Sequence, residues 1–342
     1  MPIAPDLRIA LGRAPLALGG APLGNLFRAV SDADAIGVIG AALRAGVDYF
    51  DTAPHYGHGL SEQRFGQALR NPPRGDFLLS TKVGRLLTAR ADVPRIQHAY
   101  VDGLPFVQHY DYSYDGTLRS LDDSLARLGL GRIDIAYVHD IDAATHGALQ
   151  PARFREMADG ALPALARRKE EGALAAYGLG VNDVQVCLDT LAVADLDVIL
   201  LAGRYTLADQ SALPALLPRC VERGVAIVAG GPFNSGILAT GARPRDGSAP
   251  YFNYAPAPPE VVARVEHIET VCAEFDVPLR AAALQFPRTH PAVACVLVGA
   301  RSVAELDDNL AHARHPIPRA YWEALRARGL VDAAAPLPGD VE

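Results

Sequence analysis

Four residues that can move protons stand at or just after the ends of strand-like segments in this chain. Asp51 and Tyr56 lie in DYFDTAPHYG, Lys82 in LLSTKVG and His139 in IDIAYVHD. A free phenol has a pKa of about 10. An ammonium group about 4 Å away favours the phenolate by roughly 4 kcal/mol, or about three pKa units, at an effective dielectric constant near 20. Lys82 would therefore lower the pKa of Tyr56 and let it act as an acid and base.

The other two residues complete a site for proton transfer. Asp51 would hold Lys82 charged and oriented, and His139 would donate a hydrogen bond to a substrate oxygen. This set of side chains predicts proton transfer coupled to hydride transfer, which indicates a nicotinamide-dependent oxidoreductase.

The elements that must position these residues alternate along the chain. Strand-like segments cover residues 16–20, 47–50, 77–82, 133–139, 174–180, 196–202, 225–230 and 293–299, and amphipathic helix-like segments such as 32–46, 118–130, 214–224 and 259–276 lie between them. Eight short apolar strands, each followed by a helix, predict a closed (β/α)8 TIM barrel of the α/β class. Strand ends converge at the C-terminal rim of such a barrel, where enzymes with this fold place their chemistry.

No linker divides the 342 residues, so we expect a single domain over 1–342 with its barrel core at about 16–313. Residues 84–112 and 231–258 exceed ordinary loop length and are predicted to be long loops at the C-terminal rim. The aromatic and polar residues of the first loop would suit the wall of a polar pocket, or would only pin the loop to the barrel. They are His98, Tyr100, Phe106, His109, Tyr110, Tyr112 and Tyr114.

Composition narrows the possible partners. The net charge is −7 with no basic tract, which argues against nucleic-acid or membrane partners. The four cysteines are far apart and predict buried thiols in a reducing compartment. The N-terminal segment lacks the ordered regions of a secretion signal, and no apolar window is long enough to span a bilayer. We therefore expect a cytoplasmic protein.

Three segments carry a family resemblance. DYFDTAPHYGHGLSEQRFGQAL, STKVG and RSLDDSLARLGLGRIDIAYVHDID resemble the signature blocks of the aldo-keto reductase family, and the resemblance runs from about Leu16 to about Ala313. It implies a TIM barrel that binds NAD or NADP without a Rossmann domain. It also implies a catalytic tetrad, made of Asp51, Tyr56, Lys82 and His139. LGGAPLGNLF, DYSYDGTLRSL, YVHDID and LLAGRYTLADQ are more similar to the aldose 1-dehydrogenase branch, which includes L-fucose and D-threo-aldose dehydrogenases.

The resemblance also implies cofactor contacts. GGPFNSG (230–236) resembles the family's pyrophosphate loop, and GARSVAELDDNL (299–310) resembles its adenosine-side segment, a glycine turn that opens a helix. The cofactor-binding residues that it implies are Gly20, Ala21, Asp51, Asn182, Tyr205, Pro232, Phe233, Asn234, Gly236, Gly299, Arg301 and Asn309.

Four positions depart from the family pattern. A serine–asparagine pair after strand 5 aligns with Asn182 and Asp183, a glutamine after strand 6 with Ala202, and an aromatic residue after strand 7 with Gly230. Glu305 stands where many NADP-preferring relatives carry a basic residue, although Arg301 could meet a ribose 2′-phosphate. The choice between NAD and NADP stays open.

Other motifs are incomplete. GHGLSE and GLGVND do not complete a G-x-G-x-x-G fingerprint, and His55 and His58 have no third ligand nearby, so we expect no metal site.

Three functions fit these observations. The leading hypothesis is oxidation of the C1 hydroxyl of an aldose, of the L-fucose or D-threo-aldose type, to a lactone. The alternatives are a general aldehyde or ketone reductase, or a pyridoxal-type dehydrogenase, of the same family, and a cofactor-binding regulatory subunit with little turnover. The particular sugar, the physiological direction and the oligomeric state stay open.

Overall fold

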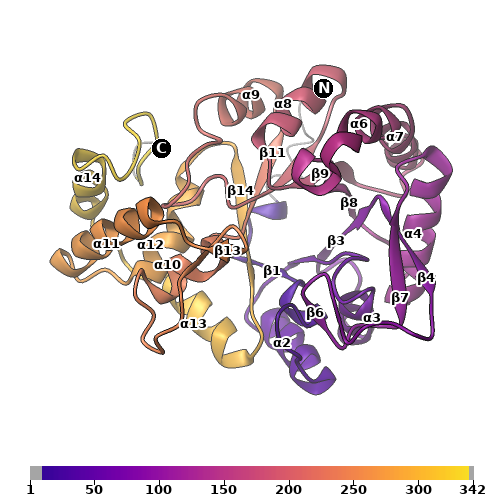
Figure 1. The fold of residues 1–342 in the computed structure, drawn as a ribbon, viewed down its shortest axis with the longest axis horizontal. Coiled ribbons are helices and arrows are strands. Elements are labelled where there is room, and N and C mark those ends of the chain that lie inside the picture. The colour runs from indigo at the N-terminus through magenta and orange to yellow at the C-terminus, as the bar shows by residue number, and fades with distance from the viewer. Residues whose placement is uncertain (1–9, 339–342) are drawn as a thin grey trace.

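The computed structural model describes residues 10–338, and within them eight parallel strands close into a barrel in the order β1-β14-β11-β10-β9-β8-β3-β2 (Figure 1). The strands are β1 (Ala17–Gly19), β2 (Tyr49–Asp51), β3 (Leu78–Val83), β8 (Ile135–His139), β9 (Ala176–Val181), β10 (Val198–Ala202), β11 (Ala226–Gly230) and β14 (Val293–Gly299). Each coincides with a predicted strand, so the (β/α)8 prediction is confirmed.

Helices form the outer layer around the strands (Figure 1). The helices that follow the barrel strands are α2 (Asp32–Arg44), α3 (Leu60–Ala68), α4 (Tyr114–Leu128), α7 (Leu162–Glu170), α8 (Val184–Val193), α9 (Leu216–Arg223), α12 (Leu279–Gln285) and α13 (Val303–Ala313). Additional helices are α5 (Ala143–His146), α6 (Gln150–Glu156), α10 (Ile237–Thr240), α11 (Pro259–Glu274) and α14 (Arg319–Ala327). Short turns of other helix types are η1 (Pro22–Gly24), η2 (Gly147–Leu149), η3 (Met157–Ala161), η4 (Asn234–Gly236) and η5 (Phe286–Thr289).

Local capping sets several helix ends. Ser31 and Ser113 accept hydrogen bonds from the backbone N–H groups of Asp34 and Gly116, which satisfies donors at the starts of α2 and α4. Gly129 ends α4 in the left-handed region, with a φ of 61° that costs glycine little. These caps fix where each helix leaves and rejoins the barrel.

The alternation of side chains along each strand separates two apolar layers. One face of the strands packs against the helices, and the other fills the barrel interior. Interior residues include Ala17, Tyr49, Ile135, Tyr137, Ala176, Val198, Leu200, Ala226, Val228, Cys295 and Leu297. Because strands have a period of two, Asp51, Lys82 and His139 lie on the same inner face as Tyr49, Ser80 and Tyr137. The tetrad residues on strands therefore continue the barrel interior at its C-terminal end.

The two predicted long loops follow β3 and β11, and each contains short elements of secondary structure that the sequence did not predict. Residues 84–112 form an antiparallel ribbon of β4 (Arg85–Ala89) and β7 (Phe106–Tyr110), with a smaller pair of β5 (Ile96–Gln97) and β6 (Tyr100–Val101). Residues 231–258 contain η4, α10 and the pair β12 (Tyr251–Phe252) and β13 (Ala255–Pro256). Pairing between the two ends of residues 84–112, and the local hairpin of β12 and β13, supply hydrogen bonds that a bare loop would leave unmade.

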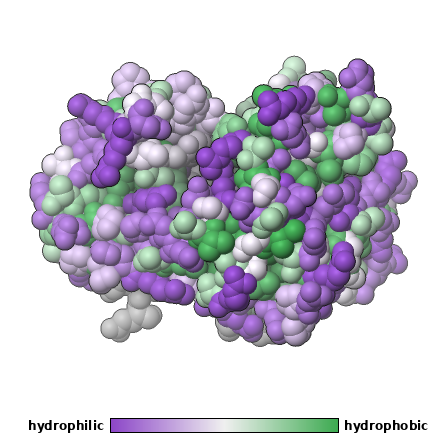
Figure 2. Space-filling view, turned by 90° about the horizontal axis from the view of Figure 1, so that it is seen from below, coloured by the Kyte–Doolittle hydropathy of each residue, from purple (hydrophilic) through white to green (hydrophobic). Residues whose placement is uncertain are grey.

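The outer surface contains both hydrophilic and hydrophobic residues. In the face that Figure 2 shows, hydrophilic residues predominate and small groups of hydrophobic residues lie among them. Within residues 10–338 none of the helices combines the length and the apolar character that crossing a bilayer requires.

Gly178 on β9 lies where two barrel strands approach each other closely, and its substitution tests that approach. A Cβ at Gly178 would lie 1.6 Å from the carbonyl oxygen of Val198 on β10, so one strand must shift. We expect Gly178→Ala to lower the free energy of unfolding by about 3 kcal/mol, measured by urea denaturation. Gly37→Ala in α2 is the control, because a Cβ there meets nothing within 4 Å; it should raise stability by about 1 kcal/mol. Equal effects of the two changes would contradict the close approach.

Candidate active site

A buried ion pair lies at the C-terminal end of β2 and β3. Lys82 Nζ is 2.5 Å from Asp51 Oδ2, and both side chains are 1% exposed. Lys82 also donates to the carbonyl oxygen of Thr52 at 2.9 Å, and Ser80 Oγ donates to Asp51 Oδ1 at 2.6 Å. Burial raises the pKa of Asp51 and lowers that of Lys82, and the ion pair opposes both shifts. The pair is thus held in one geometry by two neighbouring strands.

Tyr56 stands beside this pair, in the turn between β2 and α3. Lys82 Nζ is 4.5 Å from the centroid of the Tyr56 ring. Burial, and then the Asp51 carboxylate, raise the pKa of Tyr56 well above 10. The predicted lowering of this pKa by Lys82 is therefore wrong for the free protein, because burial and the Asp51 carboxylate both favour the neutral phenol.

His139 ends β8 and has one ring nitrogen fixed by an arginine. An Arg85 Nη atom lies 2.8 Å from His139 Nδ1, and its other Nη donates to Asp140 at 2.8 Å. Because arginine only donates, Nδ1 must accept and the ring proton must be on Nε2. Burial, together with the charges of Arg85 and Lys82, holds the pKa of His139 well below 6.5. His139 is therefore a neutral imidazole with an Nε2–H donor.

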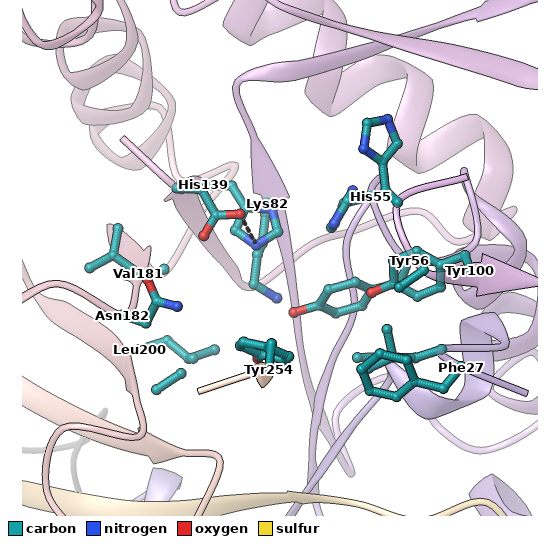
Figure 3. A pocket seen from close by; sticks show the side chains of 17 residues that line it. Phe27, His55, Tyr56, Lys82, Tyr100, His139, Val181, Asn182, Leu200 and Tyr254 are labelled. Carbon is teal, nitrogen blue, oxygen red and sulfur yellow. Dashed lines mark ion pairs between the residues drawn. The ribbon is translucent and has the colours of Figure 1, made fainter. Parts of the chain in front are cut away.

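These side chains open onto a cavity of about 370 Å³ (Figure 3). Its wall includes Tyr56, Lys82 and His139. Figure 3 shows that the ends of the Tyr56 and Lys82 side chains lie next to each other. The remaining wall combines polar rings and apolar groups, and it includes Phe27, His55, His98, Tyr100, Asp140, Asn182, Leu200 and Tyr254. Of the aromatic residues in 84–112, His98 and Tyr100 belong to the cavity wall, as the first interpretation expected. Tyr112 is buried and bonds His146, so it pins the segment to the barrel, as the second interpretation expected.

A second cavity of about 460 Å³ adjoins the first. The two share Ala21, Tyr56, Ala202 and Tyr254 on their walls. From this shared wall the second cavity extends past the ends of β11 and β14 to the start of α13.

The family model described as "Aldo/keto reductase family" matches residues 15–328, which is most of the chain. The chain belongs to the aldo/keto reductase family. Enzymes of this family are oxidoreductases that use NAD(P)H.

Individual relatives of this aldo/keto reductase are similar over nearly their whole length. It is 43% identical to pyridoxal 4-dehydrogenase of Microbacterium luteolum, covering 94% of this chain and 97% of the relative. It is 39% identical to D-threo-aldose 1-dehydrogenase of a Pseudomonas species, covering 92% and 94%. Among solved structures, the holo form of an aldo-keto reductase from Bacillus halodurans matches with a TM-score of 0.70 and 25% identity, covering 97% of this chain and 98% of that one.

The second cavity fits a nicotinamide dinucleotide. Three buried polar atoms on residues of its wall have no partner in the described chain: Arg280 Nε, Arg301 Nε and Asn309 Oδ1. Two guanidinium donors suit phosphate oxygens, and an amide oxygen suits an amino group such as that of adenine. The glycines at 230, 231, 236 and 299 leave backbone exposed to a ligand that approaches closely. The first cavity would then receive the nicotinamide end and the substrate.

Most of the predicted cofactor residues lie on these walls. The second cavity has Gly20, Ala21, Asp51, Pro232, Phe233, Gly236, Gly299, Arg301 and Asn309, and the first has Asn182. Two predicted residues lie elsewhere. Tyr205 is buried and packs against Phe286, and the buried Asn234 donates to the carbonyl oxygen of Gly203 and bonds Thr206. Both stabilise the rim instead of facing either cavity.

The unusual Asp183 has a structural explanation. Its carboxylate accepts a hydrogen bond from Val186 N at 2.8 Å and caps α8. Ala202 and Gly230 also differ from the residues that the family pattern has at these positions. Both lie on the wall of the second cavity, to which Tyr254 of the 231–258 segment also belongs.

Among the residues that sequence reasoning missed are Arg85 and Gln108, which bond the imidazoles of His139 and His55. Arg85 directly follows the STKVG segment, and that position next to a predicted rim could have indicated it. Gln108 bonds His55 from β7, where it pairs with Leu87 of β4. That register depends on a ribbon the sequence did not predict.

Glu305 provides a test of cofactor choice. Its carboxylate lies on the wall of the second cavity and accepts from Arg301 N at 2.8 Å. A ribose 2′-phosphate there would meet this negative charge, so we expect Glu305→Gln to raise kcat/KM for NADP relative to NAD by about five- to tenfold. Asp307→Asn, the same loss of charge on the exposed side of α13, should leave the ratio unchanged. A ratio unchanged in Glu305→Gln as well would place the adenosine ribose elsewhere.

Proposed function

We propose that this aldo/keto reductase oxidises the C1 hydroxyl of an aldose to a lactone, with NAD or NADP as hydride acceptor. The observation that carries the proposal is the convergence of Tyr56, Lys82 and His139 on one small cavity that adjoins a second, dinucleotide-sized one. The similarity to a D-threo-aldose 1-dehydrogenase supports a sugar as substrate.

Each residue of the site would have a separate part in the chemistry. A nicotinamide cofactor, when bound, would supply the acceptor for the C1 hydrogen, which leaves as a hydride. Tyr56, as phenolate, takes the proton from the C1 hydroxyl, so that the C1–O single bond becomes the lactone carbonyl. His139 donates from Nε2 to the same oxygen and orients it, and Lys82, held by Asp51, lies against the Tyr56 ring. In the reverse direction Tyr56 protonates a carbonyl oxygen.

A second candidate substrate is an aromatic aldehyde of the pyridoxal type. The similarity to a pyridoxal 4-dehydrogenase supports it, and so do the rings of Phe27, Tyr100 and Tyr254 on the cavity wall, which suit a flat ring. Pyridoxal carries a hydroxymethyl group next to its aldehyde and can close to a cyclic hemiacetal. Oxidation of that hemiacetal is the same step as oxidation of an aldose at C1.

A substrate screen tests the proposal. Initial rates of nicotinamide reduction should be measured for pentoses, hexoses, 6-deoxyhexoses and pyridoxal with NAD and with NADP. We expect at least one sugar to be oxidised with either cofactor, and sugars without turnover beside active simple aldehydes would contradict it. Cofactor binding without turnover of any compound would favour a regulatory subunit.

Removal of one hydroxyl tests the role of Tyr56. We expect Tyr56→Phe to lower kcat for the best substrate by about 100- to 10,000-fold, because the acid and base is lost. Cofactor affinity, measured by quenching of protein fluorescence, should change little. Tyr251→Phe is the matched control, since Tyr251 is an exposed tyrosine of the 231–258 segment. Turnover retained in Tyr56→Phe would refute the role.

The raised pKa of Tyr56 predicts opposite pH dependence for the two directions. Oxidation needs the phenolate, which is scarce below a pKa that lies above 10, so kcat/KM for the sugar should rise by up to about tenfold per pH unit between about pH 7 and pH 9. Reduction needs the neutral phenol and should be level over the same range. Rates of both reactions in one buffer series measure this, and an oxidation rate independent of pH below about pH 8 would argue against it.

A further inference from the structure

His55 lines the first cavity but has no part in the proton transfer described above. It precedes Tyr56, and its ring is in edge-on contact with that of His139, with centroids 5.8 Å apart. An edge-on contact with Tyr100, at 5.1 Å between centroids, holds the ring plane. A small substrate that reaches His139 therefore also reaches His55.

A glutamine fixes which nitrogen of His55 carries the proton. Gln108 Oε1 lies 2.9 Å from His55 Nδ1, and Gln108 Nε2 lies 3.5 Å from the backbone carbonyl oxygen of His55. A carbonyl oxygen only accepts, so the amide must present its Nε2 to the backbone and its Oε1 to the ring. His55 Nδ1 must then donate, and Nε2 of the neutral ring is an acceptor.

His55 remains neutral in this setting. Burial is the main cause that lowers its pKa well below 6.5, and the charge of Arg85 adds to it. The neighbouring rings of His98 and His58 lower it further, and only the bond to Gln108 acts in the opposite direction. The acceptor on Nε2 is therefore present at neutral pH.

His55 and His139 are thus neutral rings of opposite tautomer. Arg85 leaves His139 with a donor at Nε2, and Gln108 leaves His55 with an acceptor at Nε2. The Asp140 carboxylate is 3.5 Å from His139 Nε2, longer than a normal hydrogen bond, so that donor stays available to a ligand. Within residues 10–338, Nδ1 is the nitrogen of His55 that has a hydrogen-bond partner.

We propose that His55 is a specificity-determining residue that accepts a hydrogen bond from a hydroxyl group on the carbon next to the reacting carbon. This inference rests on the proposed function and names its substrate class: aldoses with a free 2-hydroxyl, and 2-hydroxyaldehydes in the reducing direction. The oxygen on C1 would accept from His139 while the hydroxyl on C2 donates to His55. Gln108 is the positioning residue that keeps the acceptor in place.

Pairs of substrates with and without that hydroxyl test the inference on the holoenzyme. The oxidised pairs are L-fucose with 2-deoxy-L-fucose and D-arabinose with 2-deoxy-D-ribose, and the reduced pair is glycolaldehyde with acetaldehyde. We expect the wild type to prefer the hydroxylated member by about 10- to 100-fold in kcat/KM, because its loss leaves a polar nitrogen unpaired. His55→Phe keeps a flat ring and should reduce that preference to near the intrinsic reactivity ratio.

Two further variants separate recognition from folding. His109→Phe makes the same change on the exposed face of β7, next to Gln108, and should keep the wild-type preference. Gln108→Leu leaves His55 in place but frees its tautomer, and should lose most of the preference. If His55→Phe and Gln108→Leu both keep the wild-type preference, the inference is wrong.

The outcomes distinguish this inference from the proposed function. Sugars oxidised with an equal preference in wild type and His55→Phe would refute the role of His55 and leave the function standing. No sugar oxidised would refute the function, and the glycolaldehyde pair would then decide the role of His55.

Nitrogen-15 NMR of histidine-labelled holoenzyme provides a readout that needs no turnover. At about pH 7, His55 should show a protonated Nδ1 and His139 a protonated Nε2. In Gln108→Leu the His55 signal should shift toward the other tautomer. A protonated Nε2 on His55 in the wild type would overturn the inference.

Discussion

The ion pair between Lys82 and Asp51, closed at 2.5 Å inside the mouth of the barrel, is the interaction on which the candidate site depends. Removing two charges from water costs several kcal/mol each, and the attraction between them offsets that cost only when the other polar atoms are also bonded. Ser80 and the carbonyl oxygen of Thr52 supply those bonds. A Cβ at Gly180 would lie 3.3 Å from Lys82 Cε, so a third strand leaves space for the lysine chain. Residues of the barrel strands therefore hold the ion pair, and the turn that carries Tyr56 does not.

The β4–β7 ribbon has a different role, because it orients the rings of His55 and His139 on the wall of the first cavity. Arg85 comes from its first strand and Gln108 from its second, and each bonds Nδ1 of one imidazole. The barrel thus holds the Lys82–Asp51 ion pair, while the added ribbon sets which nitrogen of each imidazole can donate or accept a hydrogen bond. This separation would let the ribbon change what the cavity recognises without disturbing the ion pair.

The alternation of eight short apolar strands with helices made the barrel predictable from the sequence. Asp51, Lys82 and His139 lie at or next to the ends of these strands, and the convergence of strand ends is a property of a parallel barrel. The ribbon was not predictable in the same way, because its register depends on pairing across a long segment rather than on local pattern. Asn234 shows what a motif resemblance cannot predict. The resemblance implied a cofactor contact, but the side-chain amide of Asn234 forms its hydrogen bonds with Gly203 and Thr206, and a match of sequence motifs does not reveal such local bonds.

The pKa of Tyr56 marks the limit of reasoning from single residues. A lysine beside a tyrosine lowers the pKa of the phenol when its charge acts alone. Here Asp51 is paired with the ammonium group, so the phenol is close to an ion pair with no net charge, and burial raises its pKa further. A neutral phenol suits the donation of a proton to a carbonyl oxygen. Acting as a base requires positive charge from another source, and Tyr56 lies on the wall shared with the second cavity. An oxidised nicotinamide ring carries such a charge and a reduced one does not. An oxidised ring bound there would therefore favour the phenolate more than a reduced ring does, and the same side chains would then serve both directions.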